Sequence, residues 1–140
     1  MTKDTFHNIK QEVALNPQTI ATDTTTVGSI IDTQDWESLV VGLISGTVTD
    51  GDYTLLLEDG DDSALSDASV VADEFLLGTE AGASLTEDTD DGKMTKLGYL
   101  GCKRYVRVSV VSTNTSTGGI VGAYSILSHG RYVPDSTQKR

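Results

Sequence analysis

The chain has 140 residues and a formal net charge of −11, with 21 acidic against 10 basic side chains. A charge of this sign opposes binding to the nucleic-acid backbone, and no apolar run approaches the roughly 20 residues that a membrane-spanning helix needs. The single cysteine, Cys102, excludes an intrachain disulfide and fits a protein made in a reducing cytoplasm. We therefore expect one domain, with neither nucleic acid nor a membrane as a partner.

The first part of the chain differs in composition from the rest. Residues 1–26 are rich in threonine and show no sustained alternation of apolar and polar side chains, and they contain Pro17, one of only two prolines. We predict an extended N-terminal arm over residues 1–26, with a short helix near Ile9–Leu15. The domain itself is expected over residues 27–134, and a C-terminal tail over residues 135–140.

After the arm, short runs rich in Val, Ile, Leu and Tyr are bounded by Gly, Asp, Asn and Ser, which is typical of strands. Asp50–Gly51 is a tight-turn signal and predicts a hairpin between the strands on either side of it. The segment Ser69–Leu77 fits either a strand or a short helical turn. The predicted strands are Val27–Ile31, Ser38–Ser45, Tyr53–Glu58, Lys93–Leu100, Arg104–Ser112 and Ile120–Ser128.

Several strands with frequent turns, and no alternation with helices, predict an all-β fold. We expect an antiparallel β-sandwich, for which a jelly roll is one winding that accommodates about eight such strands. In Arg104–Ser112 valines alternate with mainly polar residues, so one face of this strand should lie in a core. Ile120–Ser128 is more continuously apolar, which fits either a subunit contact or burial in a single core.

The acidic residues are concentrated in the middle of the chain. Residues 50–91 carry fourteen acidic and no Lys or Arg side chains, whereas residues 92–140 carry eight basic and one acidic. A calcium loop of the EF-hand type fails here, because starts at Asp50, Asp59 and Glu87 each lack the required Gly, the required Glu or both. We predict no metal site and assign the aspartates to turn geometry and to charged edges that oppose aggregation. The alternative that stays open is a cation held by carboxylates from several loops.

Motifs for catalysis are absent from the sequence. It holds no nucleophile elbow, no phosphate-binding loop and no Cys/His ligand spacing. The one conceivable thiol–imidazole pair, Cys102 with His129, has the simpler interpretation of a small half-buried thiol. We therefore expect no enzyme activity and no cofactor. Trp36 and the tyrosines could form a sugar-stacking platform, although core or interface use is commoner for aromatic side chains.

Two stretches resemble a known group of proteins. SGTVTDGDYTLLLEDGDDSALSDAS (Ser45–Ser69) and LGYLGCKRYVRVSVV (Leu97–Val111), followed by a small-residue strand ending near LSHGRYVP, resemble small virion structural proteins of tailed bacteriophages. The similarity covers roughly Val27 to Pro134. It implies a capsid decoration or cement protein that binds the outer surface of the head. Such a protein, assembled in the bacterial host cytoplasm, bridges major capsid subunits, typically as a homotrimer, and stabilises the shell.

Two other functions stay open at this stage. One is a neck or head–tail joining component of the virion, and the other is a carbohydrate-binding β-sandwich module. For the decoration role we predict three groups of contact residues. The first is the arm, with Phe6, Ile9, Val13, Leu15 and Ile20. The second joins Lys103, Arg104 and Arg107 to acidic groups on the shell or on an adjoining copy's loop of Asp59, Asp61 and Asp62. The third is the run Ile120–Leu127, with Ile120, Val121 and Ile126, which would support the oligomer core.

Overall fold

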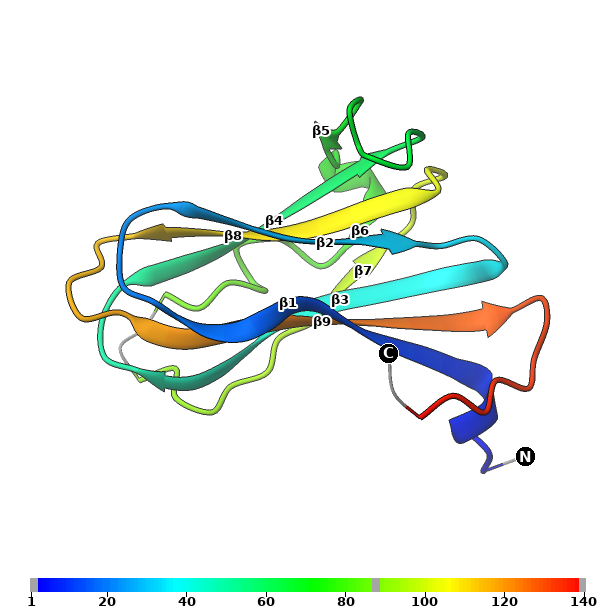
Figure 1. The fold of residues 1–140 in the computed structure, drawn as a ribbon, viewed down its shortest axis with the longest axis horizontal. Coiled ribbons are helices and arrows are strands. Elements are labelled where there is room, and N and C mark those ends of the chain that lie inside the picture. Colours follow the sequence, from blue (N-terminus) through cyan, green and yellow to red (C-terminus); the bar gives the residue numbers. More distant parts are fainter. Residues whose placement is uncertain (1–2, 87–88, 139–140) are drawn as a thin grey trace.

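The computed structural model describes residues 3–86 and 89–138. Two antiparallel sheets pack face to face into a sandwich (Figure 1), which confirms the predicted all-β class. We call the five-stranded sheet, of order β1-β9-β3-β7-β6, sheet A, and the four-stranded sheet, of order β2-β8-β4-β5, sheet B.

Sheet A is formed by β1 (Ile9–Ile20), β9 (Gly119–Gly130), β3 (Trp36–Val48), β7 (Leu97–Tyr99) and β6 (Leu76–Leu77). Sheet B is formed by β2 (Thr25–Asp32), β8 (Tyr105–Thr113), β4 (Asp52–Gly60) and β5 (Ser69–Val70). Two short 3₁₀ turns, η1 (Phe6–Asn8) and η2 (Asp73–Phe75), complete the elements of the described residues.

The winding is that of a jelly roll. The chain is folded over as a doubled ribbon in which β1 pairs with β9, β2 with β8, β3 with β7, and β4 with β5. Successive pairs of this ribbon alternate between the two sheets, which is how a jelly roll closes one core between them. The jelly-roll-like sandwich expected from the sequence is therefore confirmed.

Most of the predicted strands are present, and one is shorter than expected. Of the segment Lys93–Leu100, only Leu97–Tyr99 forms a regular strand, and an isolated bridge joins Met94 to Ile44 just before it. The ambiguous segment Ser69–Leu77 contains both alternatives, because β5, η2 and β6 follow one another within it. Local composition thus identified the strands, while their lengths depend on the neighbouring strands.

The predicted arm is wrong for most of its length. Residues Ile9–Ile20 form β1, which pairs with β9 and buries Ala14, Leu15 and Ile20, and the expected helix near Ile9–Leu15 is absent. Register shifts between Val13 and Leu15 and between Leu15 and Gln18 interrupt the period-two pattern that would have indicated a strand. Residues 1–2 of the arm lie outside the described residues.

The predicted hairpin at Asp50–Gly51 is also wrong, although the turn itself is present. Gly51 has a φ of +99°, the left-handed region that glycine tolerates. The strands it joins lie in different sheets, because β3 is already paired on both edges by β9 and β7. A turn signal fixes the local reversal of the chain, whereas strand pairing is decided by contacts that are distant in sequence.

The core lies between the two sheets. The inward positions of β8 are Val106, Val108 and Val110, all fully buried, as the alternation in the sequence predicted. They face side chains of sheet A such as Val41 and Leu43. Burying an aliphatic side chain of this size contributes about 1.5–3 kcal/mol, so the core accounts for the main favourable term in folding.

The C-terminal segment turns back onto the N-terminal end of β1 (Figure 1). The backbone N–H of Asp135 donates to the carbonyl of His7 at 2.8 Å, and the side-chain amide of Gln11 donates to the carbonyl of Gln138 at 2.8 Å. Residues 139–140 of the predicted tail lie outside the described residues. The tail is therefore held against the domain as far as Gln138.

Candidate functional site

Alternation along β9 separates core side chains from outward ones. Val121 and Leu127 are fully buried, whereas Ile120 is 42% exposed and Ile126 is half-buried on the outer face of sheet A. Of the three residues predicted to support an oligomer core, Ile120 and Ile126 are therefore placed for contact. Val121 belongs to the core of the sandwich.

The strands on either side of β9 extend this outer face. The register places Val13 of β1 opposite Tyr124, and Ile44 of β3 opposite Gly122. Val13 is 46% exposed and Ile44 is 42% exposed. We define the uncharged face as the outward positions of these three strands: Ile9, Gln11, Val13, Ser38, Val40, Gly42, Ile44, Ile120, Gly122, Tyr124, Ile126 and Ser128. None of these positions carries a charged side chain.

The centre of the uncharged face is covered by backbone of the chain itself. Gly42 and Gly122 are buried: a Cβ at Gly42 would lie 2.0 Å from the carbonyl oxygen of Thr95, and one at Gly122 would lie 2.9 Å from Cγ of Pro17. The hydroxyl of Tyr124 donates to that same carbonyl, and its burial raises the pKa of the phenol. The ring is thus fixed against the sheet, and the exposed part of the face lies around this centre, at Val13, Ile44 and Ile120.

The outer face of sheet B differs because it carries charge. Arg107 on β8 and Glu58 on β4 face each other in the register and form an ion pair at 2.7 Å, with both side chains about four-fifths buried. Two exposed apolar side chains of β2, Val27 and Ile30, lie on the same sheet. This surface is therefore mixed, and the two faces of the sandwich offer different chemistry.

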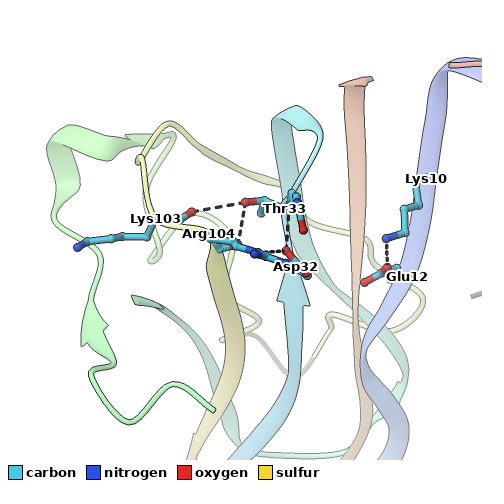
Figure 2. A network of polar contacts seen from close by, with 7 residues as sticks. Lys10, Glu12, Asp32, Thr33, Lys103 and Arg104 are labelled. Carbon is cyan, nitrogen blue, oxygen red and sulfur yellow. Dashed lines mark hydrogen bonds and ion pairs between the residues drawn. The ribbon is translucent and has the colours of Figure 1, made fainter. Parts of the chain in front are cut away.

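The cations predicted to reach another molecule have partners within the chain. Lys103 contacts Asp61 at 2.5 Å. Arg104 makes two hydrogen bonds to Asp32, at 2.9 and 2.8 Å (Figure 2). These bonds lower the pKa of Asp32 and raise that of Arg104. With Arg107 held by Glu58, each of the three cations has an intrachain partner, a pairing that the order β2-β8-β4 makes possible.

The aspartates of the predicted acidic contact loop form bonds within the chain. Asp59 is 8% exposed and accepts a hydrogen bond at 2.6 Å from Tyr99, and burial together with this bond raises the pKa of Tyr99 well above its usual range. Asp62 accepts backbone N–H bonds from Ala64 and Ser66. These are the turn-forming bonds expected of aspartate, and they lower the pKa of Asp62.

The arm residues separate into two groups. Leu15 and Ile20 are buried in the core and are closed to any partner. Phe6, in η1, is 49% exposed, and Val13 lies on the uncharged face beside half-buried Ile9. Three of the five predicted arm contacts are thus open to contact, and two of these three belong to the uncharged face.

A cleft of about 450 Å³ lies at the end of the sandwich where the β2–β3 turn meets the C-terminal segment. An adjoining cleft of about 380 Å³ shares Gln34, Asp35 and Trp36 with it. Sequence reasoning singled out Trp36 as one aromatic residue among several but missed the cleft, because the returning tail forms one wall of it. The first cleft is lined by Lys10, Gln34, Asp35, Trp36, Tyr132, Pro134, Asp135 and Ser136.

Metal binding and membrane insertion are two other functions that a chain of this size can have. Across residues 3–86 and 89–138, no three His, Cys, Asp or Glu side chains gather in a way that could hold a metal ion. Over the same residues, no helix has the length and apolar character needed to cross a membrane. The candidate surfaces are thus the uncharged face and the cleft.

The fold and these surfaces define a jelly-roll sandwich with one uncharged face. No protein-family model matches the chain, and no curated protein sequence matches it. Among solved structures, it is similar to the crystal structure of the SPBc2 prophage-derived protein YomS, with a TM-score of 0.53 and 14% sequence identity. The match covers 86% of this chain and 92% of that one. The likeness shows that a phage-derived protein has this fold over nearly its whole length.

Proposed function

We propose that this chain is a phage virion structural protein that decorates the assembled head. In this proposal it binds the outer surface of the shell and bridges major capsid subunits, which stabilises the particle. Two findings support a phage context: the resemblance of Ser45–Ser69 and Leu97–Val111 to phage structural proteins, and the fold shared with a prophage-derived protein.

The observation that carries the proposal is the uncharged face. A protein of net charge −11 repels like-charged surfaces, yet its outward positions on β1, β9 and β3 carry no charge. Depletion of charge and exposure of apolar side chains are the features that mark the centre of protein–protein interfaces. The acidic segment of residues 59–67 lies at the end of sheet B, while Asp91 bonds the backbone of Val48 at the β3 edge of the uncharged face, and these carboxylates keep the surface around the face solvated.

We assign the uncharged face to contact between copies in a homo-oligomer, with a trimer as the expected form. An oligomer presents the same shell-binding surface several times, so weak individual contacts with neighbouring capsid subunits add up to firm attachment. Lys103, Arg104 and Arg107 have intrachain partners, so we do not assign them to the bridging contacts.

Copy number in the particle tests the assignment. Virions of the phage or induced prophage that encodes the chain would be purified, and the protein quantified by mass spectrometry against the major capsid protein. Hundreds of copies support a decoration protein, whereas about a dozen copies indicate a symmetric ring at the neck. Absence from purified particles would refute a virion role altogether.

Substitutions on the uncharged face test whether this face is needed for binding to the particle. Ile120→Asp places a carboxylate on the uncharged face, near the start of β9, and should lower occupancy on particles. Val27→Asp is the matched control, because Val27 is 55% exposed on sheet B, outside the face. Equal occupancy of the two variants would remove the uncharged face from the proposal.

A further inference from the structure

We propose that the cleft at Trp36 is a binding site for a neutral saccharide. This second activity goes beyond attachment to a capsid and does not depend on it. The first cleft has a volume of about 450 Å³, within the range of about 300–1,000 Å³ that is typical of small-molecule sites. The second cleft, of about 380 Å³, continues from it across the same three residues, which gives room for more than one sugar ring.

Two aromatic side chains line the first cleft. Trp36 is half-buried: part of its side chain packs against the hydrophobic core, and the indole lies over Gly130, where an added Cβ would lie 2.8 Å from Cζ3. Tyr132 is 80% exposed, which is a high value for a large aromatic side chain. Aromatic side chains combine an apolar face with a polar edge, which suits the C–H face and the hydroxyls of a sugar ring.

Polar groups beside these rings can both donate hydrogen bonds to sugar hydroxyls and accept hydrogen bonds from them. Gln34 and Ser136 each offer donors and acceptors, and the Asp35 carboxylate is an acceptor. Asp35 has a φ of +69°, the left-handed conformation that aspartate tolerates in turns, and it lies in the turn between β2 and β3. It is held there because the backbone N–H of Arg131 donates to the carbonyl of Asp35 at 2.8 Å.

The charges around the two clefts favour a neutral ligand over an anion. Each cation nearby already has a carboxylate within hydrogen-bond distance, and Asp35 and Asp135 add further negative charge to the lining. A phosphate or carboxylate ligand would therefore meet like charges, which opposes its binding. The four ion pairs are Lys10–Glu12, Arg104–Asp32, Lys103–Asp61 and Arg131–Glu37. Figure 2 shows the first two of them.

The single tryptophan makes the proposal directly measurable, because Trp36 alone supplies the indole fluorescence of the chain. The purified full-length protein would be titrated with maltose, cellobiose, lactose and N,N′-diacetylchitobiose, and with sialyllactose as the anionic counterpart of lactose. We expect a saturable fluorescence change with at least one neutral sugar, with a Kd of about 1 mM, and weaker binding of sialyllactose. Saturation-transfer NMR with the same sugars provides a second readout.

Variants separate the cleft from the rest of the surface. Tyr132→Ala and Gln34→Ala should each weaken binding about three- to tenfold, the range that loss of one stacked ring or hydrogen bond produces. Phe75→Ala, at an exposed aromatic outside both clefts, should leave the Kd unchanged. The proposal is overturned if no neutral sugar gives a signal in either assay at about 10 mM, ten times that Kd. It is also overturned if sialyllactose binds more tightly than lactose, or if both cleft variants bind as the unmodified protein does.

Discussion

The outer faces of the two sheets differ in the charge of their side chains. On sheet A the outward positions of β1, β9 and β3 are apolar or small and uncharged. On sheet B the central strands carry the pair Arg107–Glu58, and Arg104 bonds to Asp32 at the end of β2. The comparison shows how an acidic protein can keep one face open for association while the other face stays compatible with water.

Removing β1 should have the largest effect, because it removes part of the uncharged face and part of the core at once. Deletion of residues 1–20 takes away one of the three strands of the uncharged face and exposes the core beneath Leu15 and Ile20. The loss of two buried aliphatic side chains at about 2–5 kcal/mol each is comparable to the stability of a small domain. We therefore expect no cooperative unfolding transition by circular dichroism.

Deletion of residues 1–5 is the control for this truncation, because it ends before η1 and removes no strand. It should unfold at the same denaturant concentration as the full chain. If the 1–20 deletion also unfolded at that concentration, β1 would not be the integral edge strand described above.

The next effect in size is on self-association. Ile120→Asp should weaken association of copies at least tenfold, because a carboxylate in an apolar contact costs more than about 1.4 kcal/mol. Val27→Asp on sheet B should leave association unchanged. Sedimentation velocity over a range of concentrations measures both, and an Ile120→Asp chain that assembles like the unmodified chain would count against the face.

Lowering the pH should reduce the stability of the fold through the acidic loops, without changing the association of copies through the uncharged face. Backbone N–H bonds hold the pKa of Asp50, Asp62 and Asp67 below the usual value of 3.8. A carboxyl with a depressed folded pKa stabilises the fold above its unfolded pKa, and this contribution is lost as the pH falls through the folded value. The melting temperature should thus stay level from pH 7 to about 5 and fall below about pH 4.

Association supplies the contrasting measurement in this titration. No carboxylate lies on the uncharged face, but the imidazole of His129 bonds Ser38 and Ser128 of that face. Because histidine is the side chain that can change charge between about pH 5 and 8, the measurement uses the His129→Gln chain, whose dissociation constant between copies should stay the same from pH 7 to about 5. A steep change of association over that interval would mean that titrating groups take part in the contact.

The smallest predicted effect concerns the charged pair on sheet B. A double-mutant cycle of Arg107→Met and Glu58→Gln should give a coupling energy of about 1 kcal/mol, because the side chains are largely but not fully buried. Neither change should alter association. A coupling energy near zero in urea denaturation would show that the pair adds no stability.

Much of the sandwich could be predicted from local patterns. Valines at every second position of Arg104–Ser112 and turn residues between short apolar runs were sufficient for the strands after Val27. β1 could not be found in this way, because its irregular pairing with β9 removes the alternation. The false hairpin at Asp50–Gly51 has a related cause, since pairing partners in a jelly roll are distant in sequence.

The candidate sites were less accessible to sequence reasoning. Ile120 and Ile126 were identified within an apolar run, but Ile44 and Val13 join them only through the register with β9. The cleft depends on the C-terminal segment returning to His7, which no local pattern indicates. The cations were placed on other molecules because nothing in the sequence shows that β8 lies between β2 and β4.

A cryo-EM map of the purified particle tests most directly whether the uncharged face is an association surface. We predict that the outer faces of β1, β9 and β3 meet protein density from neighbouring copies. A map in which Ile44, Ile120 and Tyr124 face open solvent would contradict the account.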